Sequence, residues 1–265
     1  MQRVAIVGSG HLAHALWEGW HLNPLPSRTF SLIVRSDAHR HLWDDAVWNT
    51  VVYDPSAVKG HDVVVIAVNP KDAATTLTQL HPHLEDAMVI SPIAGWSIAK
   101  LRAHGISGPL VRIMPNVCAA IGASTTLATF DGCDSAQQEA LEALIGECGP
   151  VTVVEESLMD PYTALVGSGP AYIFLLLEAL IASGERLGAD AGRTRQLVSS
   201  MVEGAARLAR HRSNEPLSTW IEQVASPGGT TEALLAVLNQ AKWPHLIQDA
   251  IVAASLRAQE LGAKT

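Results

Sequence analysis

Tracts of a single residue type, closely spaced cysteines and an excess of basic side chains are all missing from this chain of 265 residues. With 48% hydrophobic and 17% charged residues, the composition is typical of a folded globular protein and excludes a largely disordered one. The length exceeds one average domain and falls short of two, so we expect one large domain or a larger and a smaller one.

Basic residues are too few to form a surface that attracts polyanions. The chain has 18 Lys and Arg against 26 Asp and Glu, which gives a formal net charge of -8. Non-specific binding to nucleic acid or to an anionic membrane needs a stripe or cluster of positive charge, and the sequence shows none. We therefore predict neither as a partner, and any acidic ligand must be held by local hydrogen-bond donors.

The three cysteines, Cys118, Cys133 and Cys148, are odd in number and lack the C-x-x-C spacing of metal and redox sites. The N-terminus reads as a strand and turn rather than as a leader, so we predict a reduced, cytoplasmic protein. The most apolar run, AYIFLLLEALIASG from Ala171, is broken by Glu178 and is expected to be too short to cross a bilayer. The segments HRH (39–41) and HPH (81–83) have metal-ligand spacing, but no acidic or cysteine cluster accompanies them. We predict solvated histidines and no metal site.

Strand and helix patterns divide the chain into an α/β part and an all-helical part. Up to about residue 155, apolar β-branched runs alternate with helical patterns, which is typical of parallel βαβ units with strands buried on both faces. The expected strands begin at Val4, Phe30, Thr50, Val63, Met88, Leu110 and Val151, and the later helices are expected at 171–187, 193–211, 216–225, 231–240 and 244–261. We predict a Rossmann-type dinucleotide-binding domain with a parallel sheet over 1–156. An all-α domain would follow over 157–265.

The run YIFLLLEALI within this helical part is apolar on nearly every face of a helix, whereas a surface helix would show one apolar stripe. We expect it to be buried on all sides. A second subunit would provide the cover, or the run would be the central helix of a monomeric bundle.

The stretch VAIVGSGHLAHAL places Gly8, Gly10 and Ala13 in the G-x-G-x-x-G/A pattern between a strand and a helix. Gly8 permits the tight turn, Gly10 lets a pyrophosphate approach the backbone, and Ala13 allows close packing of helix and strand. Helix N-terminal N–H groups then face the phosphates. A glycine turn without a ligand is the alternative, and His11 either contacts a phosphate or lies in solvent. The predicted cofactor contacts are Gly8, Ser9, Gly10, His11 and Leu12.

The end of the second strand distinguishes the two nicotinamide cofactors. An NAD enzyme usually has an acidic residue there, but this chain has Arg35 and Ser36, which match a 2′-phosphate. We predict NADPH, with NADH as a possible second cofactor. Asp37 follows at once, and we expect it to start the next helical segment.

A second glycine-rich segment, SPGGTT at 226–231, leads into the apolar run EALLAVL. Gly228 and Gly229 can turn successive N–H groups inward, and the start of the next helix adds positive potential. Such a corner binds a carboxylate without a basic side chain, and the hydroxyls of Thr230 and Thr231 suit a nitrogen beside it. An ordinary helix cap is the alternative.

Six motifs resemble the pyrroline-5-carboxylate reductase family, and the resemblance covers almost the whole chain. They are IVGSGHLA from Ile6, IAVNPK from Ile66, IAGWSIAKL from Ile93, VRIMPN from Val111, GSGPAYIF from Gly167 and VASPGGTTEALLAVLN from Val224. The resemblance implies an oxidoreductase that reduces the cyclic imine pyrroline-5-carboxylate to proline with NAD(P)H, the last step of proline biosynthesis. It also implies a Rossmann domain followed by a helical domain that forms a homodimer, often within a larger ring.

The resemblance assigns roles to individual residues. Thr231 is the implied catalytic residue, which would hydrogen-bond the imine nitrogen. The substrate carboxylate would be held by Ser226, Gly228, Gly229 and Thr230. Further cofactor contacts would come from Ala67, Val68, Asn69, Pro70, Ala94, Met114, Pro115 and Asn116. Several of these also suit an ordinary role at the end of a strand.

Three of the motifs depart from the family pattern. Asn69 stands in place of a lysine, Val117 and Cys118 in place of threonine and proline, and Val166 in place of serine. The identity of the substrate is therefore open, and a reductase of a different cyclic imino acid is the main alternative. A non-catalytic NADPH-binding sensor is a further one, although it would not need SPGGTT. A β-hydroxyacid dehydrogenase would need a lysine in the helix after GSGPAY, and the run IFLLLEAL has none.

Overall fold

The computed structural model describes residues 2–48 and 50–263. The chain divides into two compact units, which we describe separately. The first consists of the residues up to Pro170 together with those from Ala253 onward, and the second is Ala171–Val252. The domain boundary after residue 156 stays a prediction.

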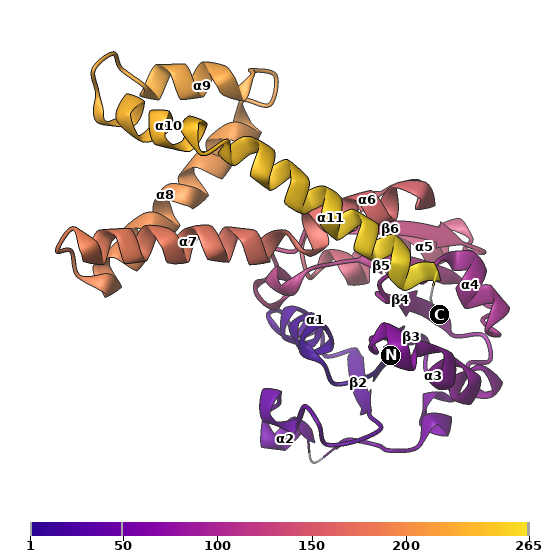
Figure 1. Cartoon of the computed structure of the whole chain (residues 1–265). Helices are drawn as coiled ribbons and strands as arrows, with labels where there is room; N and C mark the ends of the chain where they lie inside the picture. The colour runs from indigo at the N-terminus through magenta and orange to yellow at the C-terminus, as the bar shows by residue number, and fades with distance from the viewer. Residues whose placement is uncertain (1, 49, 264–265) are drawn as a thin grey trace. The chain divides into compact units, whose positions relative to one another are not determined.

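Within the described residues, seven strands of the first unit form one sheet in the order β2-β1-β3-β4-β5-β6-β7 (Figure 1). Neighbouring strands are parallel except for β5 and β6, which pair antiparallel. The strands are β1 (Gln2–Val7), β2 (Arg28–Ile33), β3 (Val63–Ile66), β4 (Met88–Ser91), β5 (Leu110–Met114), β6 (Thr126–Asp131) and β7 (Val151–Val153). The predicted α/β, Rossmann-type architecture is confirmed.

Two details of the sheet differ from the sequence-based expectation. The run from Thr50 forms no strand, because it lies at the sheet edge with Val52 and Tyr53 exposed. Val52 makes only an isolated bridge to Ile33. The sequence analysis missed β6, whose pairing with β5 is antiparallel and therefore falls outside a regular βαβ pattern.

The two faces of the sheet belong to two separate hydrophobic cores. Val4, Ile6 and Val65 pack on one face, which is covered by α1 (His11–His21) and α5 (Ser135–Gly146). The alternate residues of the same strands pack on the other face, against α3 (Ala73–Leu80) and α4 (Ile98–Ala103). The sheet is therefore buried on both faces, as the continuously apolar strand sequences predict.

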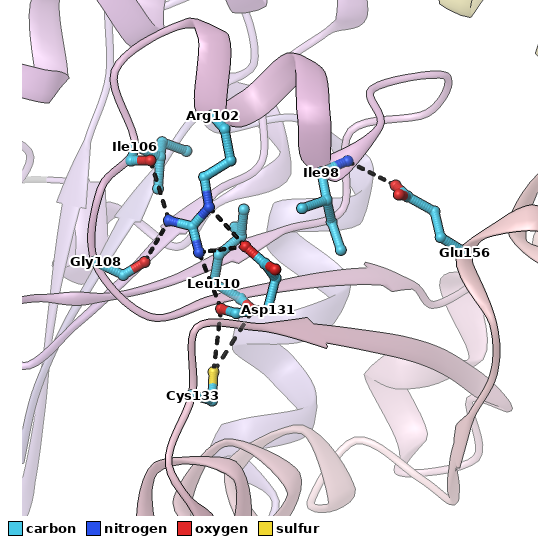
Figure 2. A network of polar contacts seen from close by, with 8 residues as sticks. All are labelled: Ile98, Arg102, Ile106, Gly108, Leu110, Asp131, Cys133 and Glu156. Carbon is cyan, nitrogen blue, oxygen red and sulfur yellow. Dashed lines mark hydrogen bonds and ion pairs between the residues drawn. The ribbon is translucent and has the colours of Figure 1, made fainter.

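Arg102 on α4 holds the segment between α4 and β5 in place (Figure 2). Its guanidinium donates to the carbonyl oxygens of Ile106 at 3.0 Å and Gly108 at 2.6 Å. It also binds the carboxylate of Asp131, at the end of β6, at 2.7 Å. One cation thus satisfies backbone acceptors beside the antiparallel strand pair.

Glu156, which follows the last strand, hydrogen-bonds residues of the sheet and of α4. Its Oε1 accepts from the backbone N–H of Ile98 at 2.6 Å (Figure 2) and from Arg112 at 3.1 Å. Arg112 lies in β5, with only 3% of its side chain exposed, and also donates to Asp160 at 2.7 Å. Because a buried guanidinium needs anionic partners, this pair of carboxylates fixes the start of the helical segment that follows.

Short helical segments connect the larger elements of the first unit. They are η1 (Arg40–Leu42), α2 (Asp45–Trp48), η2 (Pro55–Val58), η3 (Pro70–Asp72), η4 (His81–His83), η5 (Val117–Ile121), η6 (Glu156–Leu158), α6 (Met159–Tyr162) and the π-helical η7 (Thr163–Gly167).

Helices joined by short loops make up the second unit, which contains most of α7 together with α8, α9, α10 and the first part of α11. The bounds are α7 (Gly169–Arg186), α8 (Ala191–His211), α9 (Leu217–Val224), α10 (Thr230–Gln240) and α11 (Trp243–Ala263). Each lies within a few residues of a helix expected from the sequence. Gly184 of α7 approaches α8 so closely that a Cβ there would lie 2.6 Å from the Cγ2 of Thr194.

Helical conformation is continuous over Glu156–Arg186. By length and composition this stretch is apolar enough to cross a membrane, which corrects the expectation that the apolar run is too short. Phe174 and Leu175 are 55% and 66% exposed, which is not the environment of a central helix in a monomeric bundle. Apolar surface of this kind marks an interaction site.

Gly149, between α5 and β7, provides a test of the packing in the first unit. It has a φ of 128°, and a Cβ there would overlap the backbone of Ser124. We expect Gly149→Ala to lower the free energy of unfolding by about 2–3 kcal/mol, measured by chemical denaturation. The matched control is Gly146→Ala at the end of α5. A Cβ at Gly146 meets no atom within 4 Å, so this variant should change stability by about 1 kcal/mol or less. Equal stability of the two variants would contradict the close packing of Gly149 against Ser124.

Candidate functional site

The glycine loop between β1 and α1 has the conformation that a dinucleotide site requires. Gly8 has a φ of 109°, and a Cβ there would overlap the carbonyl oxygen of Ala67 just after β3. Gly10 is the N-cap of α1, with φ -70° and ψ 175°, and a Cβ there would meet no atom within 4 Å. The loop therefore presses against β3 on one side and leaves the N-terminus of α1 accessible on the other.

A side chain from another loop supports this turn. The indole Nε1 of Trp43 donates to the carbonyl oxygen of Ser9 at 2.9 Å, and this contact is buried. The backbone N–H of Gly8 donates to Ile33 at the end of β2 at 2.9 Å. The sequence analysis did not identify the role of Trp43.

A cavity of about 510 Å³ opens at the carboxyl ends of β1, β2 and β3. The chain runs from β1 to β2 on one side and then returns to β3 on the other side of β1, so the cavity lies where the strand order reverses. This is where open α/β sheets bind their ligands. The predicted residues that line it are Gly8, Ser9, Gly10, His11, Leu12, Arg35, Ser36, Ala67, Val68 and Asn69.

The remaining predicted cofactor residues lie outside the described lining of this cavity. They are Pro70, Ala94, Met114, Pro115 and Asn116. Met114 and Ala94 pack together in a small cluster with Met159 and Leu127. Their contact with a cofactor stays a prediction.

Asn116 is held by hydrogen bonds within the protein. Its Nδ2 donates to the carbonyl oxygen of Val166 at 3.2 Å, and its Oδ1 accepts from the N–H of Cys118 at 3.0 Å. This amide thereby joins the end of β5 to η7. Cys118 is half-buried, and desolvation raises the pKa of its thiol, which disfavours a reactive thiolate.

Charged and phenolic groups also line the cavity. Arg35 is exposed and forms an ion pair with Asp72 at 3.1 Å, a partner that the sequence analysis missed. Tyr53 donates to the carboxylate of Asp37, and this hydrogen bond raises the pKa of the phenol. The carbonyl oxygen of Asp37 also accepts from the N–H of Arg40, so Asp37 begins the turn into η1.

The SPGGTT segment lies in the second unit and forms a tight corner before α10. Gly228 has a φ of 71°, and the N–H of Gly229 donates to the carbonyl oxygen of Ser226 at 3.0 Å. A Cβ on Gly229 would lie 2.6 Å from the Oγ of Ser226. The two glycines are thus needed for different reasons, the first for its dihedral angle and the second for close approach.

This corner already binds a carboxylate of the chain itself. The N–H of Gly228 donates to Oε2 of Glu232 at 2.7 Å. Gly229 is the N-cap of α10, and the helix begins at Thr230, one residue before the predicted start. Thr230 is exposed and Thr231 half-buried. The arrangement suits an anion next to two hydroxyl groups.

Comparison with known proteins bears on both sites. Residues 156–261 match the family described as pyrroline-5-carboxylate reductase dimerisation, and residues 3–95 match the one described as NADP oxidoreductase, coenzyme F420-dependent. The pyrroline-5-carboxylate reductase of Corynebacterium melassecola is 32% identical over 99% of this chain and 99% of its own length. The chain belongs to the pyrroline-5-carboxylate reductase family.

Two further proteins of this name are similar over nearly the whole chain. Pyrroline-5-carboxylate reductase 1 of Bacillus spizizenii is 30% identical over 98% of this chain and 89% of its own length. The Plasmodium falciparum pyrroline carboxylate reductase, solved with NADP bound, has the same fold with a TM-score of 0.89. It is 23% identical, and the match covers 98% of each chain. The resemblance read from the motifs is thus confirmed.

Substitution by alanine should affect the two loop glycines differently. Gly10→Ala should change the free energy of unfolding by about 1 kcal/mol or less, because its Cβ enters open space. It should nevertheless weaken NADPH binding at least about tenfold, since the new methyl group stands where a pyrophosphate approaches the backbone. Gly8→Ala, by contrast, should lose about 2 kcal/mol or more of stability. Thermal denaturation and a fluorescence titration with NADPH measure the two effects, and unchanged NADPH affinity in Gly10→Ala would place the dinucleotide elsewhere.

Proposed function

We propose that this protein reduces pyrroline-5-carboxylate to proline with NADPH. The observation that carries the proposal is the match to named reductases of this activity, at 30–32% identity over 98–99% of the chain. The corner at SPGGTT, where the backbone N–H of Gly228 binds a carboxylate, supports an amino-acid-like substrate.

The cavity of the first unit fits NADPH. The N-terminus of α1 and the open space beside Gly10 suit the pyrophosphate, since only a glycine N-cap leaves room for it. Arg35 and Ser36 line the same cavity after β2 and suit a 2′-phosphate, while no acidic residue occupies the position that selects NAD. When bound, NADPH supplies the hydride for the imine carbon.

On this proposal, the corner before α10 holds and orients the substrate. The N–H of Gly228 binds the substrate carboxylate in place of the Glu232 side chain that it binds in this structure, while the N–H of Gly229 holds the turn through Ser226. Ser226 supports the turn through its contact with Gly229. Because a protonated imine is already electrophilic, most of the catalytic effect comes from positioning.

Thr231 holds the imine nitrogen in this proposal. It is the second residue of α10 and half-buried, so its hydroxyl lies next to the same corner that takes the carboxylate. The hydroxyl accepts a hydrogen bond from the protonated nitrogen and orients the ring. Arg102, Arg112 and Lys100 play no part in this step, because their charges serve the packing of the first unit.

The active protein is a homodimer or a ring of dimers on this proposal. The match of residues 156–261 to the dimerisation family supports it, and so does the exposed apolar surface of α7. A partner subunit on this surface accounts for the apolar run better than a membrane does. With a net charge of -8, we expect no nucleic acid partner, and we propose a cytoplasmic location.

The substrate assignment is tested by comparing cyclic imines in NADPH oxidation by the full-length protein. We expect the highest kcat/KM with pyrroline-5-carboxylate. Both the six-membered cyclic imine and the pyrroline that carries its carboxylate at position 2 should give lower values. A preference for another ring would make Asn69, Val117, Cys118 and Val166 the candidate specificity residues. Tight NADPH binding without turnover of any imine would instead support a sensor.

Removal of the Thr231 hydroxyl tests the nitrogen contact. We expect Thr231→Ala to lower kcat/KM for pyrroline-5-carboxylate by about ten- to a hundredfold, as expected for loss of a hydrogen bond to a charged group. The Kd for NADPH and the Tm should stay at their wild-type values. Thr219→Ala is the matched control, because Thr219 is also half-buried near the start of a helix in the second unit. Full activity of Thr231→Ala would exclude the assigned role.

A further inference from the structure

Two histidines from different loops meet at the cavity of the first unit. His11 is the first residue of α1, and His39 lies between β2 and η1. Both line the cavity, and their ring centroids are 6.2 Å apart, with the ring planes at 71°. His39 is half-buried. His41, of the same HRH segment, is exposed and lies outside the described lining.

The histidine pair shares this cavity with the residues proposed for the 2′-phosphate. Arg35 and Ser36 line it from the same loop as His39, which follows Ser36 by three positions. Arg35 is already paired with Asp72, so part of its positive charge is offset before any ligand arrives. A phosphate dianion at this place needs further donors.

Most of the other charges near the pair have partners of opposite sign. Arg40, next to His39, pairs with Asp45 at 2.9 Å, and Asp37 accepts from Tyr53. On α1, His14 pairs with Glu18 at 3.2 Å. The ring centroids of His41 and His39 are 6.5 Å apart. In the part of the chain that the structure describes, no carboxylate pairs with His11 or His39, so a proton on either ring is free to serve a ligand.

We propose that His11 and His39 bind the 2′-phosphate of NADPH together, each ring donating an N–H hydrogen bond from its protonated form. The inference rests on the proposed function, because it needs NADPH as the cofactor. At a centroid separation of 6.2 Å, nitrogen atoms of both rings can reach oxygens of a single phosphate group. Two cationic rings at this distance repel each other, so protons are taken up from solvent together with the phosphate rather than before it.

The pH dependence of binding follows from this coupling. Because each ring donates from its protonated form, NADPH binding is coupled to proton uptake, and the affinity for NADPH increases as the pH falls. The second ionisation of a phosphate monoester lies near pH 6, so the phosphate stays largely dianionic between about pH 8.5 and 6.5. NADH has no 2′-phosphate, and its affinity should not follow this trend.

The test compares His39→Gln with the wild type in fluorescence titrations of the full-length protein with NADPH and NADH at pH 6.5 and 8.5. For the wild type, NADPH should bind about tenfold more tightly at pH 6.5 than at 8.5. In His39→Gln this ratio should fall to about threefold, because His11 keeps its own proton uptake, and the Kd for NADH should be unchanged at both pH values. His41→Gln is the matched control and should behave as the wild type, because its ring lies outside the described cavity lining. If His39→Gln has a lowered Tm, His11→Gln replaces it in the same titrations.

The outcomes separate this inference from the proposed function. A wild-type pH profile in His39→Gln, with NADPH still bound and turned over, overturns the histidine pair alone. Equal weakening of NADPH and NADH also overturns it, because the ring would then contact a part common to both cofactors. If the wild type binds no NADPH at either pH, both the pair and the proposed cofactor are wrong.

Discussion

The contact between Gly8 and the end of β3 is the constraint on which the nucleotide end of this protein depends. With a φ of 109°, and with the carbonyl oxygen of Ala67 where a Cβ would stand, the position accepts only glycine. Because the turn is so tight, α1 begins three residues later and directs its N-terminus toward the carboxyl edge of the sheet. Trp43 fixes the other side of the turn through Ser9. The position of α1 and its preceding loop gives rise to the cavity, to the open space beside Gly10 and to the contact between the rings of His11 and His39.

Backbone N–H groups, rather than basic side chains, are the donors that this acidic chain presents at both candidate sites. The first unit presents the start of α1, and in the second the N–H of Gly228 binds the carboxylate of Glu232. Such donors carry no net charge, so they let a chain with a net charge of -8 bind anionic ligands locally without attracting polyanions over its surface. Arg35 adds positive charge to the cavity of the first unit, and His11 and His39 line the same cavity.

Several polar residues of the family motifs serve the architecture directly. The side-chain amide of Asn116 hydrogen-bonds the backbone of Val166 and of Cys118, and so links β5 to the helical segment that follows the sheet. Arg112 and Glu156 form a second link between the same parts. These contacts explain why polar residues occur in buried strand-end segments, since a buried polar group needs a partner. They also place the apolar helix α7 directly after a rigid anchor, with its exposed surface available to a partner subunit.

The alternating α/β order, the glycine turn, the later helices and the family can all be predicted from the sequence, because they depend on local periodicity, on glycine conformation and on long specific motifs. The remaining features depend on contacts between distant residues. Tertiary structure turned β6 antiparallel and reduced the run from Thr50 to a single bridge, since strand formation depends on the neighbour and on burial. It also brought Asp72 and His39 to the cavity from positions whose local patterns carry no sign of it. Residues far apart in the chain meet only when the sheet is assembled, and no local pattern records that meeting.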